Sequence, residues 1–180
     1  MEYFRKAELR DGTPCTLRSA EPEDAPDLCV LMRRTAEESE YLALSPEEVP
    51  AAEAERRFIA EIKDSAASAV ICAFLYGRAA GSLLLRPVSQ RKKCSHRAEV
   101  GLSVLQSCQG RGIGSLLMEA AVEAARRAGF LRLELAAAVS NRRAAALYRK
   151  FAFAPCGLLP CGIRLGSGKY EDLQIMSRSV

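Results

Sequence analysis

A glycine-rich turn between two regular patterns is the part of this sequence best suited to binding an anion. Gly110, Gly112 and Gly114 alternate within Ser107–Leu117, a β-type run precedes them, and an Ala/Leu-rich helical run follows. Backbone N–H groups at the start of a helix lack partners and carry partial positive charge. Glycine leaves those groups uncovered, so the pattern predicts a cradle for phosphate.

Spacing separates the motifs that could form such a cradle. A Walker P-loop requires Lys-Ser/Thr after its last glycine, but Ser115-Leu116 follows here, which excludes it. A dinucleotide fingerprint requires glycine where Ser115 stands, although Glu134 lies near the expected acidic position about 20 residues downstream. The spacing matches Gln109-x-x-Gly112-x-Gly114 instead.

Other side chains in the sequence could also take part in chemistry. Tyr148 lies on the apolar stripe of a later helix, where a phenol either packs or offers its proton. Asn141 stands where it would cap that helix. Two residues are candidate general bases or ordinary charged residues of a strand end. They are Glu99, within the central strand, and His96, just before the strand begins. Cys108 precedes a helix N-terminus, which would favour a reactive thiolate.

Hydrophobic spacing predicts the elements that would position these groups. Strands are predicted at 16–19, 68–76, 80–88, 98–105 and 131–135, with a closing hairpin at 156–164 and 170–177; helices are predicted at 24–38, 46–62, 114–128 and 141–151. The strand, turn, helix, strand and helix from 98 to 151 form a βαβα unit, which requires parallel central strands. We therefore predict an α/β fold with a mixed, twisted sheet of about six to seven strands flanked by helices.

Bulk properties exclude several classes of protein. A chain of 180 residues suits one domain, and a net charge of +4 is too mild for a nucleic-acid binder. Without a long apolar run or a signal-peptide core, we expect no membrane association. Seven scattered cysteines suggest reduced thiols and a cytoplasmic location, and a single histidine argues against a zinc site.

Two motifs in order carry a resemblance to a known family. Gln109-x-x-Gly112-x-Gly114, followed by Asn141-x-x-Ala144-x-x-Leu147-Tyr148-x-Lys150-x-x-Phe153, resembles the GNAT superfamily of acyl-CoA-dependent N-acyltransferases. The resemblance begins near Leu17-Arg18 and extends through Gly168-x-Tyr170-x-Asp172, so it covers nearly the whole chain. The sequence departs from the family at Ala152, where a glycine is usual, and lacks the common proline before Gln109.

The resemblance implies one GNAT-like N-acetyltransferase domain over residues 1–180 with acetyl-CoA as acyl donor and no metal. It implies cofactor contacts from Leu102, Ser103, Val104, Gln109, Gly110, Arg111, Gly112, Ile113, Gly114, Ser115, Asn141 and Tyr148. In the family the central strand leaves its neighbour at a bulge, which frees amides near Val104 to polarise the thioester carbonyl. Tyr148 would return a proton to the departing thiolate, and Glu99 or His96 would act as base.

The predicted reaction is direct transfer of an acetyl group from acetyl-CoA to a primary amine on a small molecule or peptide. We expect neither nucleic acid nor membrane as a partner, and a homodimer is compatible with this interpretation. The acidic residues Glu37, Glu38, Glu40, Glu47 and Glu48 suggest a cationic acceptor or simply a solvated helix face. A non-catalytic acyl-CoA-binding or regulatory module and an NAD-type dinucleotide-binding protein are the alternatives.

Overall fold

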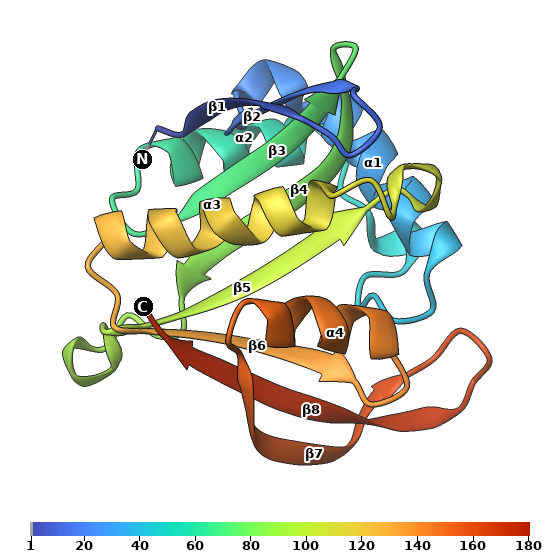
Figure 1. Cartoon of the computed structure of the whole chain (residues 1–180), viewed down its shortest axis with the longest axis vertical. Coiled ribbons are helices and arrows are strands. Elements are labelled where there is room, and N and C mark those ends of the chain that lie inside the picture. The colour runs from blue at the N-terminus through green and yellow to red at the C-terminus, as the bar shows by residue number, and fades with distance from the viewer. Residues whose placement is uncertain (1) are drawn as a thin grey trace.

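Across residues 2–180, one eight-stranded sheet organises the fold, in the order β1-β2-β3-β4-β5-β6-β8-β7 (Figure 1). The computed structural model describes residues 2–180. The strands are β1 (Phe4–Glu8), β2 (Pro14–Ser19), β3 (Ala69–Leu75), β4 (Arg78–Pro87), β5 (Arg97–Val104), β6 (Arg132–Ala138), β7 (Ala154–Arg164) and β8 (Tyr170–Ser179). The expected six to seven strands were too few because β1, an exposed edge strand of sequence FRKAE, has no apolar alternation.

In the described part of the chain, four α-helices cover the two faces of the sheet. They are α1 (Ala25–Glu38), α2 (Ala52–Lys63), α3 (Ile113–Arg127) and α4 (Arg142–Lys150). The first pair packs on one face and the second pair on the other (Figure 1). Within residues 2–180, none of the helices is long and apolar enough to cross a membrane.

Each face of the sheet has its own hydrophobic core. Leu117 and Met118 of α3 are fully buried against Leu133 and Met176 on one face. On the other face, Leu31 of α1 belongs to the cluster that α1 and α2 form with β3 and β4. Burying a side chain of this size contributes about 1.5–3 kcal/mol, so the two cores fix the helices rigidly on the sheet.

The sheet divides between β5 and β6. These strands are parallel, as predicted, but they pair over only three positions, from Arg97↔Arg132 to Glu99↔Glu134. Beyond Glu99 the two strands diverge (Figure 1), and β6 continues along β8 as far as Ala138↔Leu173. The β4–β5 register runs without a shift, so the bulge expected from the family is absent. Beyond the third pair, β5 stays paired with β4 and β6 with β8.

Two glycines permit close packing around this division. A Cβ atom on Gly81 of β4 would lie 2.9 Å from the carbonyl oxygen of Ser103 on β5. A Cβ atom on Gly114 would lie 3.1 Å from Leu147 Cδ2 on α4. Both distances are shorter than ordinary carbon contacts. Glycine therefore lets the end of β5 and the start of α3 approach their neighbours.

Candidate active site

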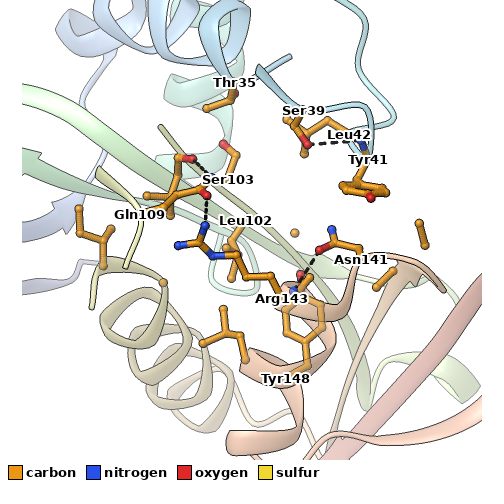
Figure 2. Close-up of a pocket in the computed structure, with 18 of the residues that line it drawn as sticks. Thr35, Ser39, Tyr41, Leu42, Leu102, Ser103, Gln109, Asn141, Arg143 and Tyr148 are labelled. Carbon is orange, nitrogen blue, oxygen red and sulfur yellow. Dashed lines mark hydrogen bonds between the residues drawn. The ribbon is translucent and has the colours of Figure 1, made fainter. Parts of the chain in front are cut away.

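A cavity of about 510 Å³ occupies the gap between β5 and β6. Its walls come from the end of α1 and the loop after it, the end of β5 with the glycine turn, the end of β6, and α4. Figure 2 shows Tyr41 and Leu42 on one side of this cavity, with Asn141 and Tyr148 on the other. The cavity thus runs from the predicted phosphate cradle to the loop after α1.

The glycine turn presents a row of available backbone donors to one end of the cavity. Gly110 has φ 81° and Gly112 has φ 107°, a left-handed conformation that glycine adopts without strain. Within residues 2–180, no hydrogen bond uses the backbone N–H groups of residues 110–114. The turn leads directly into α3, so the helix dipole adds positive potential there. This arrangement can hold a diphosphate.

Gln109 ties the end of β5 to α4 beside the turn. Its Nε2 donates to the carbonyl oxygen of Val104 at 3.0 Å, and its Oε1 accepts from Arg143 Nη1 at 2.5 Å. The Arg143 side chain extends across the cavity mouth toward Gln109 (Figure 2). Gln109 therefore supports the cradle, and Arg143 brings a cation close to it.

Arg111 lies outside the cavity lining, unlike the other eleven residues expected to contact the cofactor. Its guanidinium donates to Asp11 Oδ2 and to Thr13 Oγ1, each at 2.6 Å. Its side chain thus fastens the β1–β2 turn to the glycine turn. Such a contact between distant segments has no signal in the local sequence.

The end of β5 exposes backbone groups to the gap. Leu105 N–H bonds the Ala80 carbonyl oxygen on β4, and bonding alternates along an antiparallel strand. The backbone groups of Leu102 and Val104 therefore point away from β4, toward the side where β6 has diverged. Leu102 and Val104 both line the cavity, and their N–H groups can polarise a carbonyl oxygen held there.

Tyr148 and Asn141 come to the cavity from α4. The Tyr148 side chain is 8% exposed and its ring lies 6.2 Å from that of Phe153. Burial raises the pKa of Tyr148 to about 12, so the phenol keeps its proton at neutral pH. Asn141 caps α4 by accepting from Ala144 N–H at 3.1 Å, and its amide nitrogen faces the cavity (Figure 2).

The two bases predicted from the sequence are not among the residues that line the cavity. Glu99 forms an ion pair with Arg86 of the neighbouring strand β4. His96 precedes β5, at the end of the strand opposite the cavity. Glu134, the acidic residue of the dinucleotide alternative, accepts from Arg97 at 2.7 Å, and it too lies outside the lining.

Several other lining residues were not among the catalytic or cofactor-binding residues predicted from the sequence, and four of these carry a charge or a phenol group. Among the described residues, Glu38 is the only carboxylate in the lining, and its Oε2 accepts from Gln106 N–H at 2.6 Å. Tyr41 lies in the loop after α1, Arg10 in the β1–β2 turn, and Arg143 on α4. Of these four residues, only Arg143 lies close to a predicted site residue in the sequence, since it follows the capping Asn141 by two residues.

Comparison with known proteins agrees with the geometry. Residues 32–153 match the model of the acetyltransferase (GNAT) family. A GNAT-family acetyltransferase from Streptococcus pneumoniae has 28% identity and a TM-score of 0.88, with 92% of this chain and 99% of that chain covered. The fold also matches yncA from Salmonella typhimurium, solved with its cofactor acetyl-CoA, at 16% identity and a TM-score of 0.81, covering 92% and 93%.

A curated relative matches part of the chain. The Bacillus subtilis (strain 168) protein named "Putative phosphinothricin acetyltransferase YwnH" is 35% identical over 83 residues, which is 46% of this chain. The matched region spans half the length of that relative. The family match, by contrast, takes in more than half of this chain, including the glycine turn and α4. The chain therefore belongs to the GNAT family of acetyltransferases.

Proposed function

We propose that this protein transfers an acetyl group from acetyl-CoA to a primary amine by direct attack of the amine on the thioester. The observation that carries the proposal is a single cavity with unpaired amides of the glycine turn at one end and the opened end of β5 beside Tyr148 further along. The first feature suits a diphosphate, and the second suits a reacting carbonyl and its leaving group. Coenzyme A thioesters contain both.

Each part of the donor has a suitable set of groups in this chain. The amides of residues 110–114 would hold the diphosphate, and the Asn141 amide would contact the pantetheine arm. The Leu102 and Val104 N–H groups would stabilise the negative charge that develops on the carbonyl oxygen. A preorganised donor of this kind accelerates acyl transfer by about 10²–10³-fold. Tyr148 would then protonate the departing thiolate.

An amine must lose a proton before it can attack, and we assign this step to Glu38. Glu38 lines the cavity, and the Gln106 N–H fixes one of its carboxylate oxygens. Glu99 and His96, the bases expected from the sequence, would need a relay of water to reach the same space. The other lining groups beside Glu38, such as Thr35, Ser39 and Tyr41, are neutral and polar. They suit a small amine or the amino group of a peptide.

The reaction is tested by following thiol release from acetyl-CoA with a panel of polyamines, amino acids, peptides and aminoglycosides. Thiol release with at least one amine is expected. A protein that binds acetyl-CoA but releases no thiol with any of them would support the non-catalytic binding module instead. Stabilisation by NAD(H) but not by acetyl-CoA in a thermal-shift assay would support the dinucleotide alternative.

The base is tested with three variants under saturating acetyl-CoA. Glu38→Gln should lower kcat by about 10²-fold, as expected for loss of a general base. Glu99→Gln should leave kcat within about twofold of the wild type because its carboxylate pairs with Arg86. Glu37→Gln, an exposed neighbour outside the lining, controls for the change of charge. A large loss in Glu99→Gln alone would return the role to Glu99.

A further inference from the structure

Two arginine side chains lie beside the glycine turn, each near a different glycine. A Cβ atom on Gly112 would lie 3.8 Å from Arg10 Cγ, and one on Gly110 would lie 3.8 Å from Arg143 Nη2. Both arginines line the cavity. Arg10 comes from the β1–β2 turn and Arg143 from α4, so different elements bring the two cations to the row of unpaired amides.

The β1–β2 turn holds the backbone of Arg10 in place. Arg10 N–H donates to the Arg111 carbonyl oxygen at 3.1 Å, and Leu9 beside it is buried. The Arg111 side chain in turn bonds Asp11 and Thr13. The β1–β2 turn and the glycine turn are therefore joined by a backbone hydrogen bond and by two side-chain hydrogen bonds. When Arg10 binds a ligand, only its side chain and not its backbone has to become ordered.

Neither arginine is neutralised by the protein. Within residues 2–180, no carboxylate forms an ion pair with Arg10 or Arg143. The acidic residue nearest to Arg10 in the sequence is Asp11, and its carboxylate forms an ion pair with Arg111. Among the described residues, the Arg143 side chain bonds only the neutral amide oxygen of Gln109. Both guanidinium groups thus keep a net charge available to an anion.

The geometry points to a two-arginine clamp in which Arg10 and Arg143 bind the diphosphate of the acyl donor beside the glycine turn. This inference rests on the proposed function. Backbone amides supply dipoles, whereas a diphosphate carries full negative charges that a guanidinium meets with two parallel N–H groups. Arg10 lies outside residues 32–153, the part of the chain that the family model matches. The first hairpin would thus contribute to donor affinity.

The clamp is tested by calorimetric titration of the full chain with coenzyme A and with dephospho-coenzyme A, which keeps the diphosphate but lacks the 3′-phosphate. Arg10→Gln and Arg143→Gln should each weaken binding of both ligands by about tenfold. This loss of affinity should be smaller at high salt, because ions screen the attraction between guanidinium and diphosphate. Arg142→Gln, an exposed neighbour that does not line the cavity, is the matched control and should bind as the wild type does. In steady state, Arg10→Gln should raise the KM for acetyl-CoA and leave kcat unchanged.

Each other result overturns a defined part of the inference. Unchanged affinity in Arg10→Gln would remove Arg10 from the site and leave the proposed function intact. A loss confined to coenzyme A would move the clamp to the 3′-phosphate. A wild-type protein that binds neither ligand would overturn the proposed function together with the clamp. Unfolding curves check that the variants fold, since the described Arg10 guanidinium has no intramolecular partner whose loss would destabilise the protein.

Discussion

Tyr148 is a buried residue whose hydroxyl group is available to the cavity. Its ring packs on Phe153, and burial holds its pKa near 12. Tyr148→Phe keeps the ring and removes the proton. We expect kcat to fall by about 10²-fold or more, with little change in acetyl-CoA affinity. Measured thiol release and titration with coenzyme A separate the two effects, and unchanged turnover would rule out Tyr148 as the proton donor.

Ala152 occupies a backbone conformation that favours glycine. Its φ is 59°, and Phe153 N–H bonds the Tyr148 carbonyl oxygen, which closes the end of α4. A left-handed conformation costs a non-glycine residue about 1–2 kcal/mol, and glycine gives back part of that through unfolded-chain entropy. Ala152→Gly should therefore raise the free energy of unfolding by about 1 kcal/mol.

Urea denaturation measures this effect, and a second glycine variant provides its control. Ala146 is an exposed residue within the same helix, α4. Ala146→Gly should lower the free energy of unfolding by about 1 kcal/mol because glycine is a poor helix former. Equal destabilisation by both substitutions would mean that the conformation of Ala152 costs nothing.

Individual residues differed in how well the sequence predicted them. The glycine turn, Gln109 and Tyr148 line the cavity, and they were expected at one site because each belongs to a short motif on one element. Glu38 and Arg10 were not, because they reach the cavity through contacts with Gln106 and Arg111, which lie far along the chain. Local spacing carries no information about such contacts. Glu99 was chosen by its place in the central strand, but its pairing with Arg86 depends on the register of β4.

Elements with strong apolar periodicity were predicted within a few residues. The first helix, for example, was expected at 24–38 and spans Ala25–Glu38. The exposed strand β1 was missed because its contacts on the sheet are made through the backbone. The parallel relation of β5 and β6 was confirmed, but its restriction to three pairs was not predictable. Past these pairs β6 continues along β8, which comes from the end of the sequence and gives no local signal at β6.

Close approach of β4 to the end of β5 requires Gly81. Its added Cβ would lie 2.9 Å from the Ser103 carbonyl oxygen, 3.1 Å from Val104 Cγ2 and 3.3 Å from Ile113 Cγ2. Gly81→Ala should lower the free energy of unfolding by about 1–3 kcal/mol and weaken acetyl-CoA binding, because the end of β5 must shift. Gly157→Ala, whose Cβ would meet Ile175 at an ordinary 3.7 Å, is the control.

The β1–β2 turn is joined to the glycine turn by a pair of charges whose effect depends on pH. The Arg111 guanidinium, then the Thr13 N–H, lower the pKa of Asp11 from 3.8 to about 2. A lowered pKa means that the ionised form stabilises the fold above the ordinary value, and that this stabilisation disappears as the pH falls toward 2. Asp11→Asn should therefore destabilise the protein at neutral pH but not near pH 2.

Denaturation of the wild type and of Asp11→Asn across that range gives the measurement. The difference between their unfolding free energies should be constant above about pH 5 and shrink through the acid range. Glu119→Gln, which removes an exposed ion pair with Arg5 away from the cavity, controls for the loss of a surface charge. A difference that stays constant down to pH 2 would mean that the Asp11 charge does not hold the turn.

At the scale of the whole molecule, the cavity lies where the sheet is weakest. Within residues 2–180, strands β1 to β5 and strands β6 to β8 are joined only through β5 and β6, which pair at three residue positions. Residues on both sides of the gap line the cavity, including Leu102 on β5 and Ala137 on β6. A ligand in the cavity would therefore contact both parts of the sheet and replace the missing strand contacts.

Coenzyme A should accordingly stabilise the whole fold and most of all its divided region. At a hundred times its Kd, a ligand that binds only the folded state adds about 2.7 kcal/mol to the free energy of unfolding. Hydrogen exchange should slow most at residues 110–114 and at the end of β5, where the described amides lack protein partners. Slowing confined to residues 110–114 would contradict a bridging role, because it would leave the two parts of the sheet as independent as before. Equal slowing at both sites would place the donor across the gap, with its diphosphate at α3 and its thioester between β5 and β6.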